Sequence, residues 1–264
     1  MISISNIAWD SSIDDEIAEV LRNLGVSSID VAPGKYFPDV IKTTNIQIHD
    51  VRQRWADRGF SIVGIQSLLF GTKGLNVFGD SIIQKMMLNH LQHVCHIGAE
   101  LNAKKLVFGS PKNRNQAGLS DSKAHEMALE FFTTLGGIAK EEGVIICLET
   151  NPICYGANFL TSSMDTFNFV KKLNHSNIKM QLDTGAIFVN QEPFEVVESM
   201  HEVIGHIHIS EPNLAPLGSS SVNHKGLGEK LKAIKIPKTI EMLTYNEPFS
   251  AIAPAVKVVK ENYL

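Results

Sequence analysis

The sequence predicts a single-domain (β/α)8 TIM barrel, an α/β fold, over residues 1–264. Short runs of β-branched and aliphatic residues alternate along the whole chain with longer stretches of helical spacing. Eight such runs occur, and eight parallel strands close a barrel of this kind. The length of 264 residues is also close to the roughly 250 residues usual for one such domain.

The expected strands are the short apolar runs at residues 2–8, 28–31, 61–66, 105–108, 144–148, 178–182, 206–209 and 239–242. Helical spacing follows them at residues 13–23, 46–58, 81–101, 120–142, 164–173, 193–203, 228–233 and 248–261. Ser11, Ser12 or Asp14 can cap the first helix, and Gly25 can end it. Gly143 follows the fourth helix directly before a strand, which is a usual helix end.

A doubly wound open sheet is the alternative fold for the same alternation. Such sheets usually carry a Gly-rich phosphate turn after the first strand, and the segment SNIAWDSS has no glycine. The most irregular segments, at 31–44, 109–118, 150–163 and 211–225, all follow expected strands. In a barrel these loops share the catalytic face.

Composition and termini limit the classes of function. A formal net charge of -4 gives no electrostatic reason to expect nucleic acid as a partner. The first residues lack the basic and apolar regions of a signal peptide, and no run of about 18 apolar residues occurs, so we expect a cytoplasmic protein without a membrane partner. Cys95, Cys147 and Cys154 lack zinc-type spacing, and we expect Cys95 and Cys147 to be small core residues.

Four metal-competent side chains stand at or near the ends of the last four strands. The strands read VIICLET, KMQLDT, GHIHIS and TIEML, and the residues are Glu149, Asp183, His208 and Glu241. Side chains alternate between the two faces of a strand, so the four turn inward when their apolar neighbours face the helices. The sequence therefore predicts that they converge at the top of the barrel lumen.

Three carboxylates and one imidazole suit one divalent cation with mixed oxygen and nitrogen preference. Mn²⁺, Mg²⁺, Co²⁺ and Fe²⁺ fit this donor set, and Zn²⁺ is less favoured. Without a cation, three ionised carboxylates at one point would repel each other, and at least one would take up a proton.

The ordered set of motifs LET, LDTGA, GHIHISE and TIEM resembles the xylose-isomerase-like barrel superfamily of sugar and sugar-phosphate isomerases and epimerases. The resemblance covers essentially the whole chain. It implies that Glu149, Asp183, His208 and Glu241 bind the metal, and that Glu149 and Glu241 also transfer protons. The implied partner is a small sugar or sugar phosphate, and the sequence leaves a homo-oligomer open.

The implied chemistry is proton abstraction next to a carbonyl through a metal-stabilised enediolate. Carboxylates on both sides of the reacting carbon give epimerisation, whereas one carboxylate acting across adjacent carbons gives aldose-ketose isomerisation. The sequence does not decide between them. A metal-dependent dehydratase on the same barrel, of the inosose-dehydratase type, is one alternative, and a barrel that binds sugar without turnover is another.

Two departures from the family pattern bear on the substrate. Ketose 3-epimerases of the superfamily usually show a His three residues after the strand-six Asp, where this chain has Ala186. They also carry an Arg shortly after the strand-seven Glu, where NLAPLG follows here. A free ketohexose is therefore not the expected substrate. Gln66, which stands where the endonuclease branch with three zinc ions has His, speaks against that branch.

Further polar residues at the expected rim are candidates for substrate binding, namely Asn6, Trp9, Gln66, Asn151, Glu211 and His224. His206 shares the inward parity of His208 one layer deeper, and we expect a hydrogen-bonded lumen histidine there. The segment Lys112 to Arg114 is expected to be a solvated polar loop.

Overall fold

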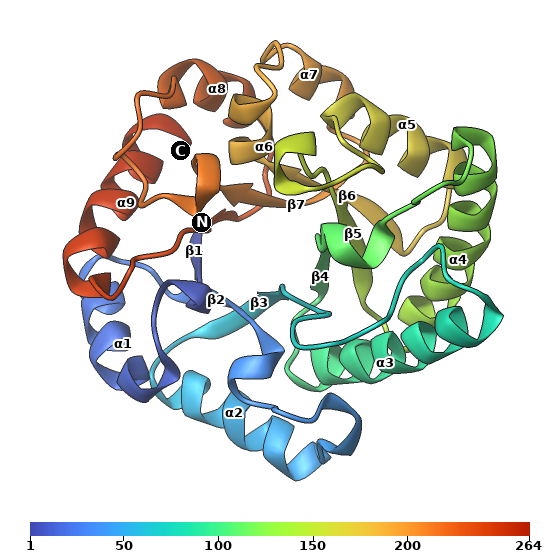
Figure 1. The fold of residues 1–264 in the computed structure, drawn as a ribbon. Coiled ribbons are helices and arrows are strands. Elements are labelled where there is room, and N and C mark those ends of the chain that lie inside the picture. The colour runs from blue at the N-terminus through green and yellow to red at the C-terminus, as the bar shows by residue number, and fades with distance from the viewer.

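The computed structural model describes residues 1–264 and contains a closed barrel of eight parallel strands in sequence order (Figure 1). The strands are β1 (Ile2–Ser5), β2 (Ser28–Val31), β3 (Ser61–Ile65), β4 (Lys105–Phe108), β5 (Ile145–Glu149), β6 (Ile178–Asp183), β7 (Ile204–Ile209) and β8 (Lys238–Ile240). Each strand pairs in parallel with its neighbours, and β1 pairs with β8 to close the barrel. The predicted fold class is thus confirmed.

The helices form a ring outside the strands in Figure 1. They are α1 (Asp14–Asn23), α2 (Asn45–Asp57), α3 (Ser81–Glu100), α4 (Asp121–Glu141), α5 (Ser163–Leu173), α6 (Thr184–Val189), α7 (Val196–Met200), α8 (His224–Leu231) and α9 (Pro248–Asn262). Polar side chains fix several of their starts. Asp80 accepts hydrogen bonds from two N–H groups at the start of α3, and Thr44 forms a capping box with Gln47 at the start of α2.

Several segments differ from the sequence-based expectation: the helix expected at 193–203 covers only Val196–Met200, β7 begins at Ile204, and β8 ends at Ile240. Three further differences have a local cause. The first strand ends at Ser5, because the Ser5 side chain caps a short 3-10 turn over Asn6–Ala8. Helix α6 was not expected; it starts at once after β6 because the Asp183 carboxylate accepts the N–H of Ala186 and caps it. The helix expected at 228–233 begins earlier, at His224, where Asn223 supplies the cap.

The hydrophobic core lies between the strands and the helix ring. It includes fully buried aliphatic residues from the strands, such as Ile29, Ile65 and Ile207. Cys95 and Cys147 are both buried, as predicted. The layer inside the barrel is more polar, since Ser3, Asp30, Gln181, His206, His208 and Thr239 are all buried there or beside it. Inward polar residues in the last strands therefore meet across the lumen, whereas their apolar neighbours pack outward.

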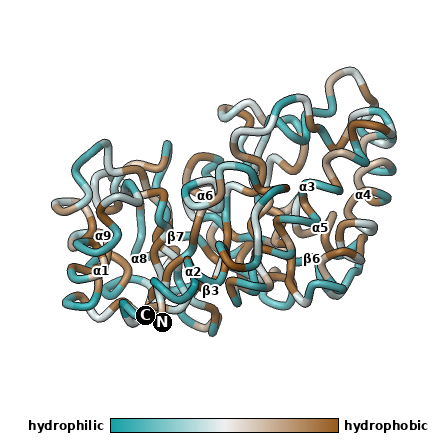
Figure 2. Tube along the Cα trace, turned by 90° about the horizontal axis from the view of Figure 1, so that it is seen from below, coloured by the Kyte–Doolittle hydropathy of each residue, from teal (hydrophilic) through white to brown (hydrophobic).

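Both chain ends lie at the same end of the molecule, as the tube in Figure 2 shows. Strand β1 starts there, and helix α9 returns antiparallel to the strands. The loops that follow the strands consequently project from the opposite end. None of the helices combines the length and the hydropathy needed to cross a lipid bilayer.

The contact between α8 and α9 leaves no room for a side chain at Gly228, where an added Cβ would overlap the backbone carbonyl of Asn262. We expect Gly228→Ala to lower the free energy of unfolding by about 1–3 kcal/mol, because backbone has to move. Gly137 in α4 has nothing within 4 Å of its would-be Cβ. Gly137→Ala is expected to raise the same quantity by roughly 0.5–1 kcal/mol through helix propensity. Urea unfolding of the two variants checks both signs, and equal effects would contradict the packing argument.

Candidate metal centre

Glu149, Asp183, His208 and Glu241 meet at one point at the top of the barrel. One potential ligand atom from each residue lies within 4.8 Å of those of the other three. Glu149 and Asp183 end β5 and β6, His208 lies near the end of β7, and Glu241 directly follows β8. The structure therefore brings together the four residues that the strand-end pattern selected.

Strand register sets their common height. Asp183 is paired with His208 across β6 and β7, and His208 is paired with Thr239 across β7 and β8. Glu241 N–H donates to the Ile209 carbonyl, so the ladder continues past the end of β8. A parallel sheet aligns the carboxyl ends of its strands, which is why residues far apart in sequence share one layer.

The His208 ring lies between two of the carboxylates. Its Nδ1 is 3.1 Å from Glu241 Oε2 and 3.5 Å from Glu149 Oε1. Gln66 Nε2 donates to the other Glu241 oxygen at 2.7 Å, and Asn151 Nδ2 donates to Glu149 Oε2 at 3.4 Å. Gln66 and Asn151, which were expected to contact substrate, thus orient the carboxylates in this structure.

Asp183 is held by groups that follow its own strand and the next. Its Oδ1 accepts the N–H of Ala186 at 2.7 Å, and its Oδ2 accepts the Ser210 hydroxyl at 2.6 Å. The Ser210 hydroxyl in turn accepts the N–H of Gly185 at 2.9 Å. Backbone and side-chain donors of the protein itself therefore fix the orientation of this carboxylate.

Charge is concentrated at this point and shifts the proton affinities. Burial and the nearby charges of Glu149 and Glu241 raise the pKa of Asp183 to about 7. Burial disfavours the charged form of His208, but the Glu241 carboxylate and the neighbouring carboxylates of Asp30 and Glu149 outweigh it and raise the His208 pKa well above its usual value. Burial opposes ionisation of Glu241 as well, yet His208 and Gln66 hold its pKa below the usual value.

This donor set fits a divalent cation. Three carboxylates around one imidazole leave an excess of negative charge in a largely buried place, which a proton on Asp183 and one on His208 only partly compensate. A divalent cation at the same point replaces the two positive charges of these protons, and it can bind all four side chains at once. The mixed oxygen and nitrogen donors suit Mn²⁺, Mg²⁺, Co²⁺ or Fe²⁺.

The shifted pKa values predict how a bound cation would change the stability of the protein at different pH. The Asp183 pKa is raised from 3.8 to about 7, so between these values the folded chain holds a proton that the unfolded chain has released, and stability falls as pH rises. His208, whose pKa is also raised, stabilises the fold below its unfolded pKa of about 6.5, and this is lost as pH rises through the folded pKa. The metal-free protein should therefore be less stable at pH 8 than at pH 5.5.

We expect added Mn²⁺ to raise the thermal midpoint of unfolding more at pH 8 than at pH 5.5, since fewer protons have to leave the site. Scanning calorimetry measures this, and a larger rise at pH 5.5 would contradict it.

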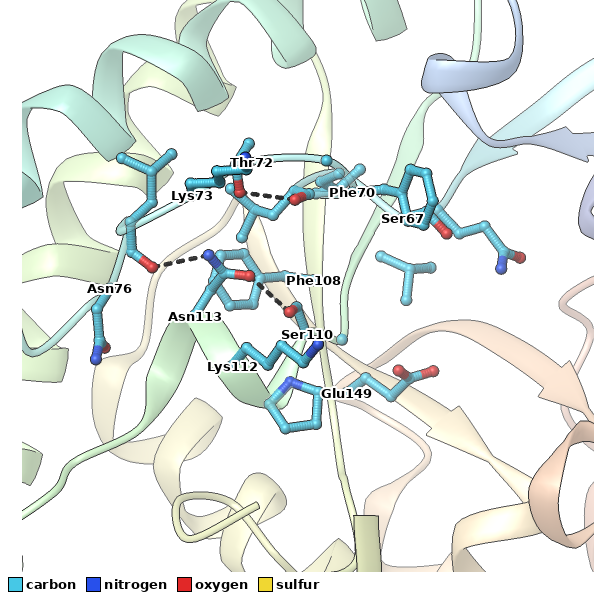
Figure 3. A pocket seen from close by; sticks show the side chains of 18 of the residues that line it. Ser67, Phe70, Thr72, Lys73, Asn76, Phe108, Ser110, Lys112, Asn113 and Glu149 are labelled. Atoms are coloured by element: carbon cyan, nitrogen blue, oxygen red, sulfur yellow. Dashed lines mark hydrogen bonds between the residues drawn. The ribbon is translucent and has the colours of Figure 1, made fainter. Parts of the chain in front are cut away.

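A cavity of about 810 Å³ opens above the cluster and includes Glu149 and Glu241 in its wall. The loops after β3 and β4 form most of it, at residues 66–76 and 107–113, together with Tyr155. In Figure 3 the Glu149 carboxylate is directed away from the hydrogen bonds drawn in these two loops. The volume lies within the range of about 300–1,000 Å³ that is usual for small-molecule sites.

The segment after β4 is not the solvated loop that we expected, and of its three polar residues only Lys112 is exposed. Asn113 is buried, donates to the Leu75 carbonyl at 2.8 Å and accepts the Ser110 hydroxyl at 2.6 Å, so it joins the two loops (Figure 3). Arg114 is only 1% exposed. Burial lowers its pKa to about 10, and the nearby Glu149 opposes this shift. The polar sequence of this segment gave no sign that the chain folds over it.

Asn6 and Trp9 lie at the end of β1 but are occupied by other contacts. Asn6 is fully buried, and its Oδ1 accepts the N–H of Ala32 at 2.8 Å. The Trp9 indole donates to Asp14 Oδ1 at 2.8 Å and packs edge-on against Trp55. Trp9 lines a second cavity of about 480 Å³ between the loops after β1 and β8, and neither residue lines the larger cavity.

Glu211 and His224 are brought together with each other rather than with the cluster. His224 Nε2 lies 2.9 Å from Glu211 Oε1, and His224 Nδ1 lies 2.7 Å from the Tyr263 hydroxyl. Glu211 also accepts the N–H groups of Gly218 and Ser220. Both side chains are buried, so in this structure they tie the loop after β7 to α8 and α9.

Asp30 and Ser210 are polar residues at the centre that the sequence interpretation missed. Asp30 is a fully buried carboxylate on β2, and its Oδ2 lies 2.9 Å from His206 Nε2. His206 is a lumen histidine with polar contacts, as expected, since its Nδ1 also lies 2.9 Å from the Gln181 amide. A charged residue inside the short apolar run SIDV was the signal that could have identified Asp30.

Comparison with known proteins agrees with the architecture. A family model described as "Xylose isomerase-like TIM barrel" matches residues 18–262. Among characterised proteins, D-psicose 3-epimerase of Ruminiclostridium cellulolyticum is 23% identical over 138 residues. That match covers 52% of this chain and 46% of the enzyme, so it spans less than half of that relative.

Solved structures of sugar epimerases superpose over almost the whole chain. 3-Keto-D-glucoside 4-epimerase from E. coli matches with a TM-score of 0.81 at 13% identity, covering 98% of both chains. D-Psicose 3-epimerase from Clostridium cellulolyticum H10, solved with D-tagatose, matches with a TM-score of 0.80 at 17% identity, covering 98% of this chain and 97% of that one. At such low identity these likenesses establish the fold and not the substrate.

Proposed function

The chain belongs to the xylose isomerase-like TIM barrel family, and from this premise we propose that it is a divalent-metal-dependent epimerase or isomerase of a sugar, a sugar phosphate or a related polyol derivative. The resemblance of the strand-end motifs to this superfamily is confirmed by the family match. One observation carries the proposal. Four ligand atoms of Glu149, Asp183, His208 and Glu241 converge within 4.8 Å, and two of these residues line the wall of a substrate-sized cavity.

The proposed metal ligands are these same four residues, which we call the metal quartet. When bound, the cation would act as a Lewis acid toward a substrate carbonyl and its neighbouring hydroxyl. Residues of the protein itself orient the two carboxylates that transfer protons in this proposal. Gln66 and Asn151 hold the Glu241 and Glu149 carboxylates by hydrogen bonds, so that each keeps a defined direction toward the cavity.

Glu149 and Glu241 are the proposed proton-transfer groups. Both approach His208 Nδ1, at 3.5 and 3.1 Å, so they come from β5 and β8 on two sides of one point. A substrate carbon held in the cavity between these two carboxylates would give a proton to one of them and receive one from the other on the opposite face. This arrangement favours epimerisation over isomerisation by a single base, and relatives with this fold include sugar 3- and 4-epimerases.

The substrate is expected to be oriented differently from a free ketohexose. Ala186 supplies no imidazole beside Asp183, and its N–H is used to cap α6. The loop residues Pro212 to Leu214 after β7 carry no guanidinium. Polar groups toward the cavity come instead from the loops after β3 and β4, including Lys73, Asn76 and Lys112. We therefore propose a sugar derivative that extends toward the loops after β3 and β4 at the cavity wall.

Solvent-deuterium exchange tests the proposal on many candidate substrates at once. Purified protein with Mn²⁺ is incubated in D₂O with a panel of ketoses, sugar phosphates and 3-keto glycosides, and mass spectrometry follows the products. Replacement of one carbon-bound hydrogen by deuterium, with the formula otherwise unchanged, supports epimerase or isomerase chemistry. Loss of water identifies a dehydratase. Saturable ligand binding with no exchange in any member identifies a barrel that binds sugar without turnover.

A further inference from the structure

Asp30 is a fully buried carboxylate for which the proposed proton transfer has no use. It lies on β2, and the neighbouring strand β3 makes room for it at Gly64. A Cβ at Gly64 would come 2.5 Å from Asp30 Oδ2 and 2.9 Å from Oδ1. The pairing of β2 with β3 also shifts register between Ile29 and Asp30. The sheet is thus locally adapted to hold a charge inside the barrel, and an isolated buried carboxylate is costly.

The groups around Asp30 are donors. The Ser3 hydroxyl donates to Oδ1 at 3.3 Å. His206 Nε2 lies 2.9 Å and His208 Nε2 lies 3.8 Å from Oδ2. The Asp30 carboxylate therefore faces two imidazoles.

The two nitrogens of His208 face different surroundings. Nδ1 faces Glu149 and Glu241 of the metal quartet, whereas Nε2 faces Asp30. Nε2 is buried and makes no hydrogen bond. Asp30 Oδ2 has His206 Nε2 at 2.9 Å, and a carboxylate oxygen can accept a second donor as well. His208 Nε2 and an oxygen with remaining acceptor capacity thus lie 3.8 Å apart. A relative movement of about 1 Å brings them to ordinary hydrogen-bond distance.

We propose that Asp30 is a positioning residue for the metal ligand His208. It accepts the Nε2–H of His208 and thereby holds the proton on that nitrogen. Nδ1 then remains free to bind the cation together with the other three members of the metal quartet. Histidine ligands of metals commonly donate their second ring N–H to a carboxylate, which fixes the tautomer and the ring orientation. This inference rests on the proposed metal site, and it assigns to β2 a part in a centre otherwise built from β5 to β8.

A second cation between Asp30, His206 and His208 is the competing explanation, because their ligand atoms also lie within 4.8 Å of one another. His208 would then have to give Nδ1 to one cation and Nε2 to the other, and a neutral imidazole has only one free nitrogen. The 2.9 Å separation of His206 Nε2 and Asp30 Oδ2 is that of a proton-mediated contact. A role of Asp30 as hydrogen-bond acceptor for His208 therefore explains the geometry without a second cation.

Metal affinity tests the proposal independently of any substrate. Titration calorimetry with Mn²⁺ at pH 7.5 should give one ion per chain, and Asp30→Asn should weaken binding by about 10–100-fold. Ser3→Ala removes the contact to Oδ1 and leaves Oδ2 in place, so it should bind Mn²⁺ as the wild type does. Gly64→Ala, whose methyl group displaces the Asp30 carboxylate, should weaken binding in the same direction as Asp30→Asn.

A spectroscopic measurement separates positioning from loss of fold. In the Zn²⁺-loaded protein labelled with 15N-histidine, the His208 Nε2–H resonance should lie downfield in the wild type and move upfield in both Asp30→Asn and Gly64→Ala. Wild-type affinity and an unmoved resonance in Asp30→Asn would overturn the proposal. Two ions in the wild type and one in Asp30→Asn would replace it with the second cation site. No Mn²⁺ binding by the wild type would reject the metal site and this role together.

Discussion

Glu149→Gln and Glu241→Gln are each expected to lower the rate of carbon-bound deuterium exchange by about 10²–10⁴-fold, which is the usual contribution of a positioned general acid or base. An amide cannot take up the proton, yet it has nearly the same shape and keeps an oxygen for the metal. The carboxamide at Glu241 can still meet Gln66, and that at Glu149 can still meet Asn151, so the folds should persist. Metal is expected to remain bound in at least one of the two variants.

Glu247→Gln is the matched control for this pair. Glu247 lies in the same loop as Glu241 but is exposed, and its carboxylate has no place in the metal quartet. The rate of carbon-bound deuterium exchange catalysed by Glu247→Gln should equal that of the wild type. Wild-type exchange in both Glu149→Gln and Glu241→Gln, with metal content unchanged, would remove these residues from the proton-transfer step.

Removal of the metal is expected to reduce exchange by at least about 10³-fold, because Lewis-acid stabilisation of the developing charge is worth several kcal/mol. His208→Ala and Asp183→Asn should mimic this loss, since each takes one donor from the metal quartet. Dialysis against a chelator, followed by readdition of Mn²⁺, Co²⁺ or Mg²⁺, measures the loss and its reversal. Metal content is determined in parallel by atomic emission.

His93→Ala is the control for the histidine substitution. The His93 ring lies on α3, outside the metal quartet, and its Nδ1 is 2.8 Å from the Asn89 carbonyl of its own helix. The variant should keep both metal and activity. Full exchange in chelator-treated protein with no detectable metal would reject a metal-dependent reaction, and the two carboxylates would then have to act without a cation.

The positions of the metal quartet show how much of the site the local sequence pattern predicts. Glu149, Asp183, His208 and Glu241 could be selected from the sequence alone because each ends or follows an apolar run of strand type. Parallel strands in a barrel bring their carboxyl ends to one layer, so position along a strand translates directly into height. The alternation of apolar runs and helical stretches likewise determined the fold class and most element boundaries within a few residues.

The contacts around the metal quartet could be identified only in the closed barrel. Asp30 faces His208 from β2, and no local pattern links these two residues, because their contact depends on the register of the whole sheet and on the space left by Gly64. Glu211 and His224 looked like rim residues but bind each other, and Arg114 looked solvated but is buried. Strand periodicity assigns a side chain to a face and a height. Which groups from distant segments meet there is decided only when the barrel closes and the loops pack over it.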